Sequence, residues 1–148
     1  MGVKIQSNVA ALVELNCETD FVARNKKFIS LVDEIATMCV KSVASEPGQP
    51  LDKTVISKNQ VADMSGGEGK TLADLVALQI GQIGENIALG GATLFTAGPG
   101  VQLSGLCHPS SGNVETEKLQ FGRYAALLAY IKHPEGENLA FLNIICNF

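Results

Sequence analysis

Cys107 and His108 are adjacent in this sequence and could act together as a nucleophile and its base. A base beside a thiol favours the reactive thiolate, which is the chemistry of cysteine hydrolases. Neighbours on an extended strand, however, point to opposite faces, and no third group that would orient the base can be named. A small Cys/His enzyme is therefore the least favoured interpretation, and we expect no enzymatic activity.

The glycine-rich segment 66–71 ends in Gly69-Lys70-Thr71, as a phosphate-binding loop does. In the motif G-x-x-x-x-G-K-[ST] the first glycine would fall on Met64, and a polar segment precedes it where a buried strand is required. We therefore expect a glycine-rich linker that enters a helix capped near Thr71.

Metal-binding patterns are equally weak. Glu14, Glu18 and Asp20 could offer oxygen ligands to a hard cation, but alternation along a strand separates Glu14 from its immediate neighbours, which favours a solvated acidic edge. The cysteines lie far apart, without C-x-x-C or His at zinc-ligand spacing. We predict no metal, no cofactor and free thiols in a reducing compartment rather than a disulfide framework. The cysteines are Cys17, Cys39, Cys107 and Cys146.

Composition limits the class of partner. The chain has 148 residues, 46% of them hydrophobic, which suits one domain with a substantial core. Eleven basic against fifteen acidic residues, with no basic block, argue against direct nucleic-acid binding. No apolar stretch approaches the ~20 residues needed to span a bilayer, and no signal peptide is recognisable. We therefore expect a protein partner and no membrane contact.

Periodicity predicts an α+β fold, an antiparallel sheet of three to four strands covered by helices. The apolar spacing of Phe28, Leu31 and Ile35 is typical of a helix, and Gly98-Pro99-Gly100 fits a turn that joins two strands in a hairpin. The predicted strands are 9–16, 87–97, 101–107 and 123–132, and the predicted helices are 26–44 and 71–85. The predicted domain organisation is a lead-in at 1–8, a core subdomain at 9–133 with a flexible linker at about 46–70, and an incomplete or divergent tail at 134–148.

The segment after the first strand carries the residue that is hardest to place. Thr19 can cap a short helical turn, with Asp20 in its first turn where a carboxylate is favoured. Phe21 then fits two interpretations: a core residue, which the residues alone favour, or an exposed anchor for a partner, because aromatic side chains are frequent interface hot spots.

Residues 13–25 resemble the signature of elongation factor Ts, in which a strand leads into N-C-E-T-D-F and then V-A-R-N. A second segment, Gln82 to Ile87, is similar to the family's I-G-E-N-I sequence. The two motifs, in the same order as in the family, relate residues 9–132 to its core. The resemblance implies a fold like the dimerisation domain of this family.

The resemblance also implies a function, guanine-nucleotide exchange on elongation factor Tu in its GDP-bound and nucleotide-free forms. Asp20 and Phe21 would enter near the partner's nucleotide and magnesium site and release GDP, and Thr19 and Val22 would hold the turn. Five neighbouring residues would support it. They are Asn16, Cys17, Glu18, Arg24 and Asn25.

Departures from the family pattern leave a second interpretation open. Gly90-Gly91 stands where the family usually has basic residues, and the sequence lacks the family's N-terminal helical domain and most of the second half of its core. The alternative is therefore a shortened fragment that docks on elongation factor Tu without efficient exchange. Arg24-Asn25 and the segment 121–125 resemble the animal mitochondrial branch, which implies the mitochondrial matrix, with the bacterial cytoplasm as the alternative.

Overall fold

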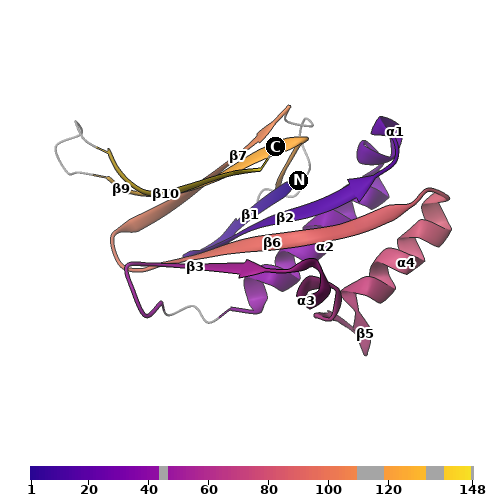
Figure 1. The fold of residues 1–148 in the computed structure, drawn as a ribbon, viewed down its shortest axis with the longest axis horizontal. Helices are drawn as coiled ribbons and strands as arrows, with labels where there is room; N and C mark the ends of the chain where they lie inside the picture. Colours follow the sequence, from indigo (N-terminus) through magenta and orange to yellow (C-terminus); the bar gives the residue numbers. More distant parts are fainter. Residues whose placement is uncertain (44–46, 110–118, 133–138, 148) are drawn as a thin grey trace.

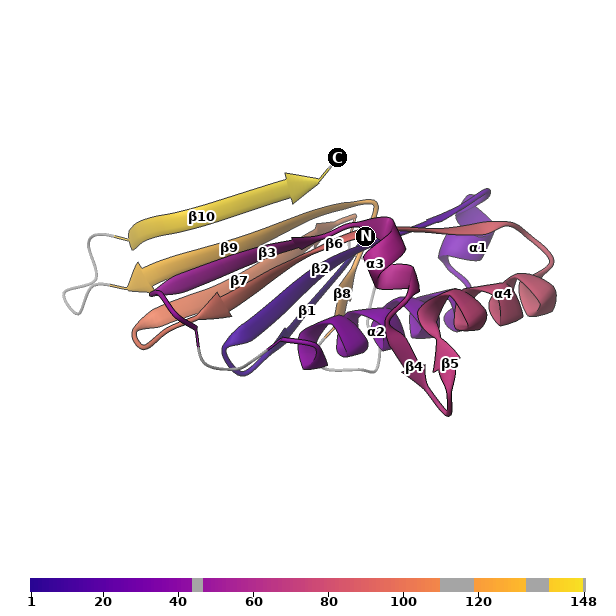
Figure 2. The same ribbon diagram turned by 60° about the horizontal axis from the view of Figure 1, so that its bottom comes forward.

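A computed structural model describes residues 1–43, 47–109, 119–132 and 139–147. Three layers make up the fold (Figures 1 and 2): helices, a five-stranded sheet and a three-stranded sheet. The elements are β1 (Gly2–Gln6), β2 (Val9–Cys17), α1 (Asp20–Ala23), α2 (Lys26–Lys41), β3 (Leu51–Ile56), α3 (Lys58–Ala62), β4 (Ser65–Gly67), β5 (Lys70–Thr71), α4 (Leu72–Ile83), β6 (Ile87–Ala97), β7 (Val101–His108), β8 (Leu119–Phe121), β9 (Tyr124–Lys132) and β10 (Leu139–Asn147). The expected α+β class with antiparallel pairing is confirmed.

Strand β2 lies at the centre of the five-stranded sheet, whose order is β3-β6-β2-β1-β8. Its residues from Val9 to Val13 are all buried, because both faces of the strand are covered. Val9, Ala11 and Val13 contribute to the core under the helices, whereas Ala10 and Leu12 pack against the three-stranded sheet. A strand buried on both faces explains the continuous apolar run in the sequence.

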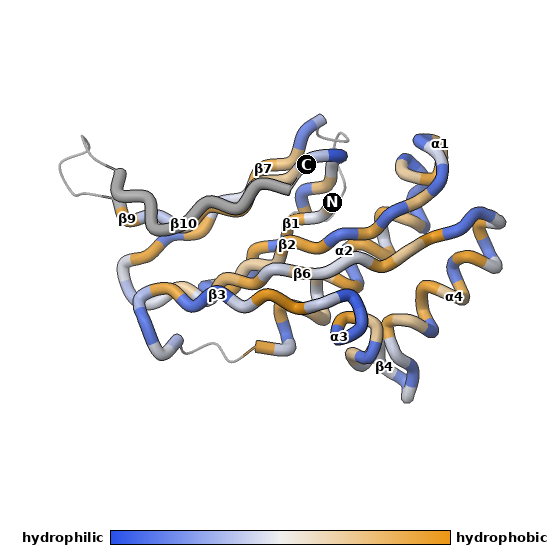
Figure 3. Tube along the Cα trace, viewed as in Figure 1, coloured by the Kyte–Doolittle hydropathy of each residue, from blue (hydrophilic) through white to orange (hydrophobic). Residues whose placement is uncertain are grey.

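The two long helices cover one face of the five-stranded sheet. Helix α2 begins after the N-cap Asn25, buries Phe28, Leu31 and Ile35, and ends at Lys41, three residues earlier than expected. Helix α4 begins after Thr71, whose hydroxyl and the Asp74 carboxylate form a capping box. Its alternating apolar and polar segments are visible in Figure 3. Both predicted helices are confirmed.

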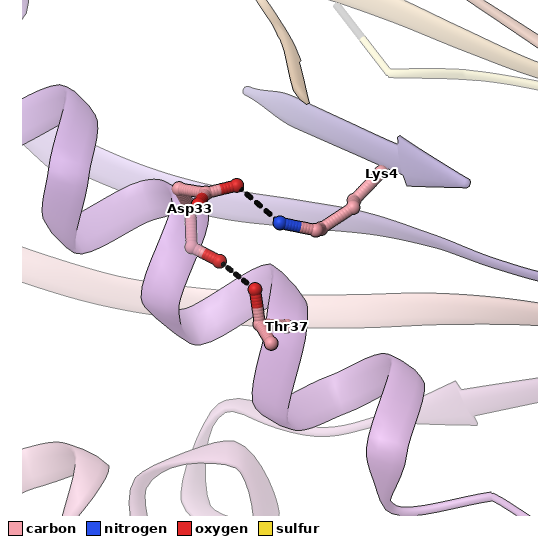
Figure 4. A network of polar contacts seen from close by, with 3 residues as sticks. All are labelled: Lys4, Asp33 and Thr37. Carbon is pink, nitrogen blue, oxygen red and sulfur yellow. Dashed lines mark hydrogen bonds and ion pairs between the residues drawn. The ribbon is translucent and has the colours of Figure 1, made fainter. Parts of the chain in front are cut away.

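Lys4 carries a charge beneath α2, in the layer between helix and sheet. Its Nζ atom lies 2.6 Å from Asp33 Oδ1, with the two side chains only 11% and 23% exposed. The hydroxyl of Thr37 donates to the backbone carbonyl of Asp33 one turn away (Figure 4). This ion pair fastens β1 to α2.

The expected hairpin between 87–97 and 101–107 is wrong. The turn forms as predicted, with Val101 N donating to Gly98 O at 3.2 Å and Gly100 at φ 82°. However, β6 already pairs with β2 on one side and β3 on the other, so it has no free edge for β7. Strand β7 instead pairs with β9, in a second sheet of order β10-β9-β7. The single sheet of three to four strands is therefore corrected to sheets of five and three strands, with a small β4-β5 ribbon.

Gly90 and Gly91 form a bulge, because they lie on β6 opposite the single residue Glu14 of β2. A Cβ at Gly90 would lie 2.6 Å from carbons of the Glu14 side chain, and one at Gly91 would lie 2.8 Å from the carbonyl oxygen of Ile56. Both positions are too crowded for a side chain unless their neighbours move.

Three segments contain regular structure that the sequence patterns did not predict. The lead-in at 1–8 contains β1, which pairs with β2 through a tight turn at Ser7, φ 55°. The predicted flexible linker contains β3, α3 and β4, and the tail contains β10, paired with β9. The predicted domain boundaries themselves stay predictions.

Candidate functional site

A four-residue helix, α1, projects beyond the end of β2 and carries the predicted partner-binding residues. Thr19 caps it as expected: its Oγ1 accepts a hydrogen bond from Val22 N at 3.3 Å. Ala23 N donates to Thr19 O and Asn25 N donates to Val22 O, which closes the turn. Asp20 occupies the first turn, where a carboxylate favours the positive end of the backbone dipoles.

Phe21 and Val22 are adjacent but have opposite environments. The Val22 side chain is 4% exposed and belongs to the core under α2, whereas Phe21 is 87% exposed. The core interpretation of Phe21 is therefore wrong, because Val22 takes the buried position of this turn. Aromatic side chains are enriched among interface hot spots, so an exposed Phe21 on a capped, anchored turn is consistent with the predicted role as a partner anchor.

The other predicted residues surround this turn and are mostly polar and exposed. Glu18, Asp20 and Arg24 lie on the surface, as does Asn25, whose Oδ1 caps α2 by accepting from Lys27 N at 2.9 Å. Asn16 donates to a Glu14 carboxylate oxygen at 2.8 Å at the end of β2. The strand and the two caps thus place the turn, while its polar groups stay in water.

Cys17 ends β2 directly before the turn and is partly exposed. Its thiol donates to Thr19 O at 3.4 Å. Burial raises the pKa of this thiol, and the nearby Glu85 carboxylate raises it further. Cys17 is therefore protonated at neutral pH, which favours a structural role over a nucleophilic one.

Two hydrogen bonds at this site involve residues that the sequence did not predict as part of it. Thr19 Oγ1 donates to both carboxylate oxygens of Glu85, at 2.9 and 3.2 Å. Lys27 Nζ donates to Gln82 Oε1 at 3.2 Å. Glu85 and Gln82 both belong to the second motif, so the structure brings the two motifs of the sequence into direct contact.

The described residues do not form the catalytic, phosphate-binding or metal-binding sites that the sequence patterns weakly suggested. Cys107 is buried and His108 is exposed on the same strand, so the two side chains point apart as expected. The segment 66–71 forms a tight ribbon with Gly67, Glu68 and Gly69 at positive φ and then the Thr71 cap. Among the described residues, no group of three His, Cys, Asp or Glu side chains could hold a metal ion. No described helix is both long and apolar enough to cross a membrane.

Several proteins of known name match nearly all of the chain. It is 37% identical over 140 residues to "Elongation factor Ts, mitochondrial" of Aedes aegypti and 41% identical over 138 residues to the protein of that name in Drosophila melanogaster. These alignments cover 93% and 90% of the chain but 45% and 43% of the relatives. The protein of the same name in Mus musculus is 32% identical, over 86% of the chain and 41% of its own length.

The chain therefore spans less than half the length of these relatives. The sequence model of the family "Elongation factor TS" matches residues 18–140, which include the turn and both motifs. The chain belongs to the elongation factor Ts family of translation elongation factors.

Proposed function

We propose that this chain is a guanine-nucleotide exchange factor that promotes release of GDP from elongation factor Tu. The observation that carries the proposal is Phe21, which is 87% exposed on a turn that belongs to the family signature. Asp20 and Phe21 enter near the nucleotide and magnesium site of the partner, and Thr19 and Val22 hold them there. No covalent bond is made or broken in this step.

The free energy for exchange comes from differential binding. A turn that binds nucleotide-free elongation factor Tu more tightly than the GDP-bound form weakens GDP binding by the same factor. Moving a Phe side chain from near-full exposure into an apolar pocket contributes about 2 kcal/mol, or about 30-fold in affinity. That value lies within the ordinary range of coupling free energies between two ligands, about 1–3 kcal/mol.

A second candidate, a fragment that docks on elongation factor Tu without efficient exchange, is favoured by one observation. The aligned residues span 45% and 43% of the two insect relatives, and the candidate assumes that efficient exchange needs contacts from outside this aligned region. The turn alone would then bind the partner without displacing GDP.

Release of a fluorescent GDP analogue from elongation factor Tu tests both candidates. We expect the chain to accelerate release at saturating concentration and Phe21→Ala to lose about 30-fold in its affinity for the nucleotide-free partner. Val55→Ala is the matched control, since Val55 is another exposed apolar residue, 68% accessible, on the edge strand β3. Binding without acceleration would support the docking fragment, and full activity of Phe21→Ala would refute the role of Phe21.

We further propose that the protein works in the mitochondrial matrix. The support is that the relatives described above carry the name "Elongation factor Ts, mitochondrial". Fractionation of cells that produce the native protein would test the location, and a purely cytosolic signal would refute it.

A further inference from the structure

We propose that Glu85 is a positioning residue that fixes the orientation of the Asp20–Phe21 turn through the hydroxyl of Thr19. The inference rests on the proposed exchange function, because it assigns a role within the same site. Glu85 itself is assigned no contact with elongation factor Tu.

The argument starts from the single hydroxyl hydrogen of Thr19. A hydroxyl can donate one hydrogen and accept at its lone pairs. Thr19 Oγ1 directs its hydrogen at the Glu85 carboxylate, 2.9 and 3.2 Å from the two oxygens, and accepts from Val22 N. Because the hydrogen is directed at the carboxylate, a lone pair of Oγ1 stays directed at the N–H group of Val22. The hydrogen bond from Thr19 to Glu85 has a charged acceptor, which makes it stronger than one between neutral groups.

Glu85 is itself held in place by the backbone. Helix α4 ends at Ile83 and is capped by Gly84, whose φ of 81° is the left-handed conformation that glycine adopts most readily, and Gly84 N donates to Ile80 O at 2.8 Å. Two residues after Glu85, β6 begins at Ile87, which pairs with Cys17 at the end of β2. Thr19 and Glu85 are each two residues beyond this pair, so they extend the same antiparallel register.

A second polar contact holds the other end of the turn. Lys27, in the first turn of α2, donates to Gln82 in the last turn of α4. The α1 turn is thus fixed on both sides to the α4–β6 junction, by Thr19 to Glu85 before it and by Lys27 to Gln82 after it. A turn ordered before binding avoids the entropy cost of ordering it in the complex.

Amide hydrogen exchange of the free chain tests the positioning role without any partner. In Glu85→Ala we expect the protection of the Val22 amide, which donates to Thr19 Oγ1, to fall about five-fold because the cap loosens. Glu85→Gln keeps an acceptor oxygen and should stay within about two-fold of wild type. Glu34→Ala, at an exposed glutamate of α2, is the control and should not change this amide. Unchanged Val22 protection in folded Glu85→Ala would overturn the inference.

The rate of GDP release from elongation factor Tu tests whether Glu85 acts through Thr19. Glu85→Ala should slow release by about five-fold in the wild-type and Thr19→Ser chains, which both have the hydroxyl, and should have no further effect in Thr19→Val. An equal effect in Thr19→Val would refute the relay through Thr19. A wild-type chain that releases no GDP would refute the proposed exchange function alone, because the amide measurement decides the positioning role by itself.

Discussion

Replacing Lys4 by Met would remove the ammonium group beneath α2 while keeping most of the apolar stem. The Lys4–Asp33 pair is neither a surface pair nor a fully buried one, since its side chains are 11% and 23% exposed. Surface pairs contribute up to about 1 kcal/mol, whereas removing one partner of a buried pair costs about 3–5 kcal/mol. We therefore expect Lys4→Met to lower the free energy of unfolding by about 2 kcal/mol.

The two single substitutions should differ, because the charges that they leave behind differ in exposure. Asp33→Ala leaves the less exposed group, the Lys4 ammonium, without its partner, so it should lower the free energy of unfolding by about 3 kcal/mol. The double substitution leaves no unpaired charge and should cost about 1–2 kcal/mol, well below the sum of the single effects.

Urea unfolding followed by circular dichroism measures these changes. With a slope of about 2 kcal/mol per molar urea, a loss of 2 kcal/mol moves the midpoint down by about 1 M. Glu34→Ala, on the exposed side of α2, supplies the control for loss of a helix carboxylate. Single effects that simply add in the double variant would show that the two charges do not stabilise each other, and the reasoning would then be wrong.

Three further predictions follow from burial and charge. Phe28→Ala should cost about 3–5 kcal/mol and Phe21→Ala less than about 0.5 kcal/mol in urea unfolding, since their side chains are 1% and 87% exposed; equal losses would contradict this. Hydrogen bonds from Thr71 lower the pKa of the Asp74 carboxyl, so its contribution is complete above the ordinary Asp pKa of about 3.9 and is lost as pH falls through the lower folded value. The melting-temperature gap between wild type and Asp74→Asn should therefore be constant from about pH 5 to 7 and close below about pH 4; a gap unchanged at pH 2 would refute it. Burial raises the pKa of the Cys39 thiol to about 11, so maleimide should modify Cys39 only in urea, as mass spectrometry would show, and rapid native labelling would contradict this.

Local patterns predicted the elements that depend on local sequence. The helix from Lys26 was visible because its buried residues recur at helical spacing, and the Thr19 cap was visible because a hydroxyl stood before an acidic first turn. Strand β6 was predicted from its apolar run and the Gly98-Pro99-Gly100 turn that follows it. For the helix, the cap and β6, the information lies within about a dozen residues. Strand β9 was chosen over a helix only because it follows the expected hairpin, so its prediction was right although the hairpin was wrong.

The missed features depend on residues that are far apart in the sequence. The segment 1–8, predicted only as a lead-in, contains the charged Lys4, whose burial in β1 depends on its pairing with Asp33, 29 residues later. The partner of β7 is decided by β2 and β3, which occupy both edges of β6. Within the site, Phe21 points outward because Val22 takes the core position. The contact of Thr19 with Glu85 spans 66 residues. Only the pairing of β2 with β6 could have suggested it.

The bulge at Gly90-Gly91 sets which residue of the second motif meets the turn. Before the bulge Val13 pairs with Ala92, and if that register continued, Asn86 would lie opposite Thr19. The extra residue on β6 shifts the alignment by one, so that Cys17 pairs with Ile87 and Glu85 comes opposite Thr19 instead. Because a shift of one residue also exchanges the two faces of a strand, the bulge acts as a phase adjustment between the register of the core and the register of the residues next to the α1 turn. If both glycines were instead paired in a regular ladder, every side chain near Thr19 would be kept and Asn86 would still replace Glu85 opposite Thr19.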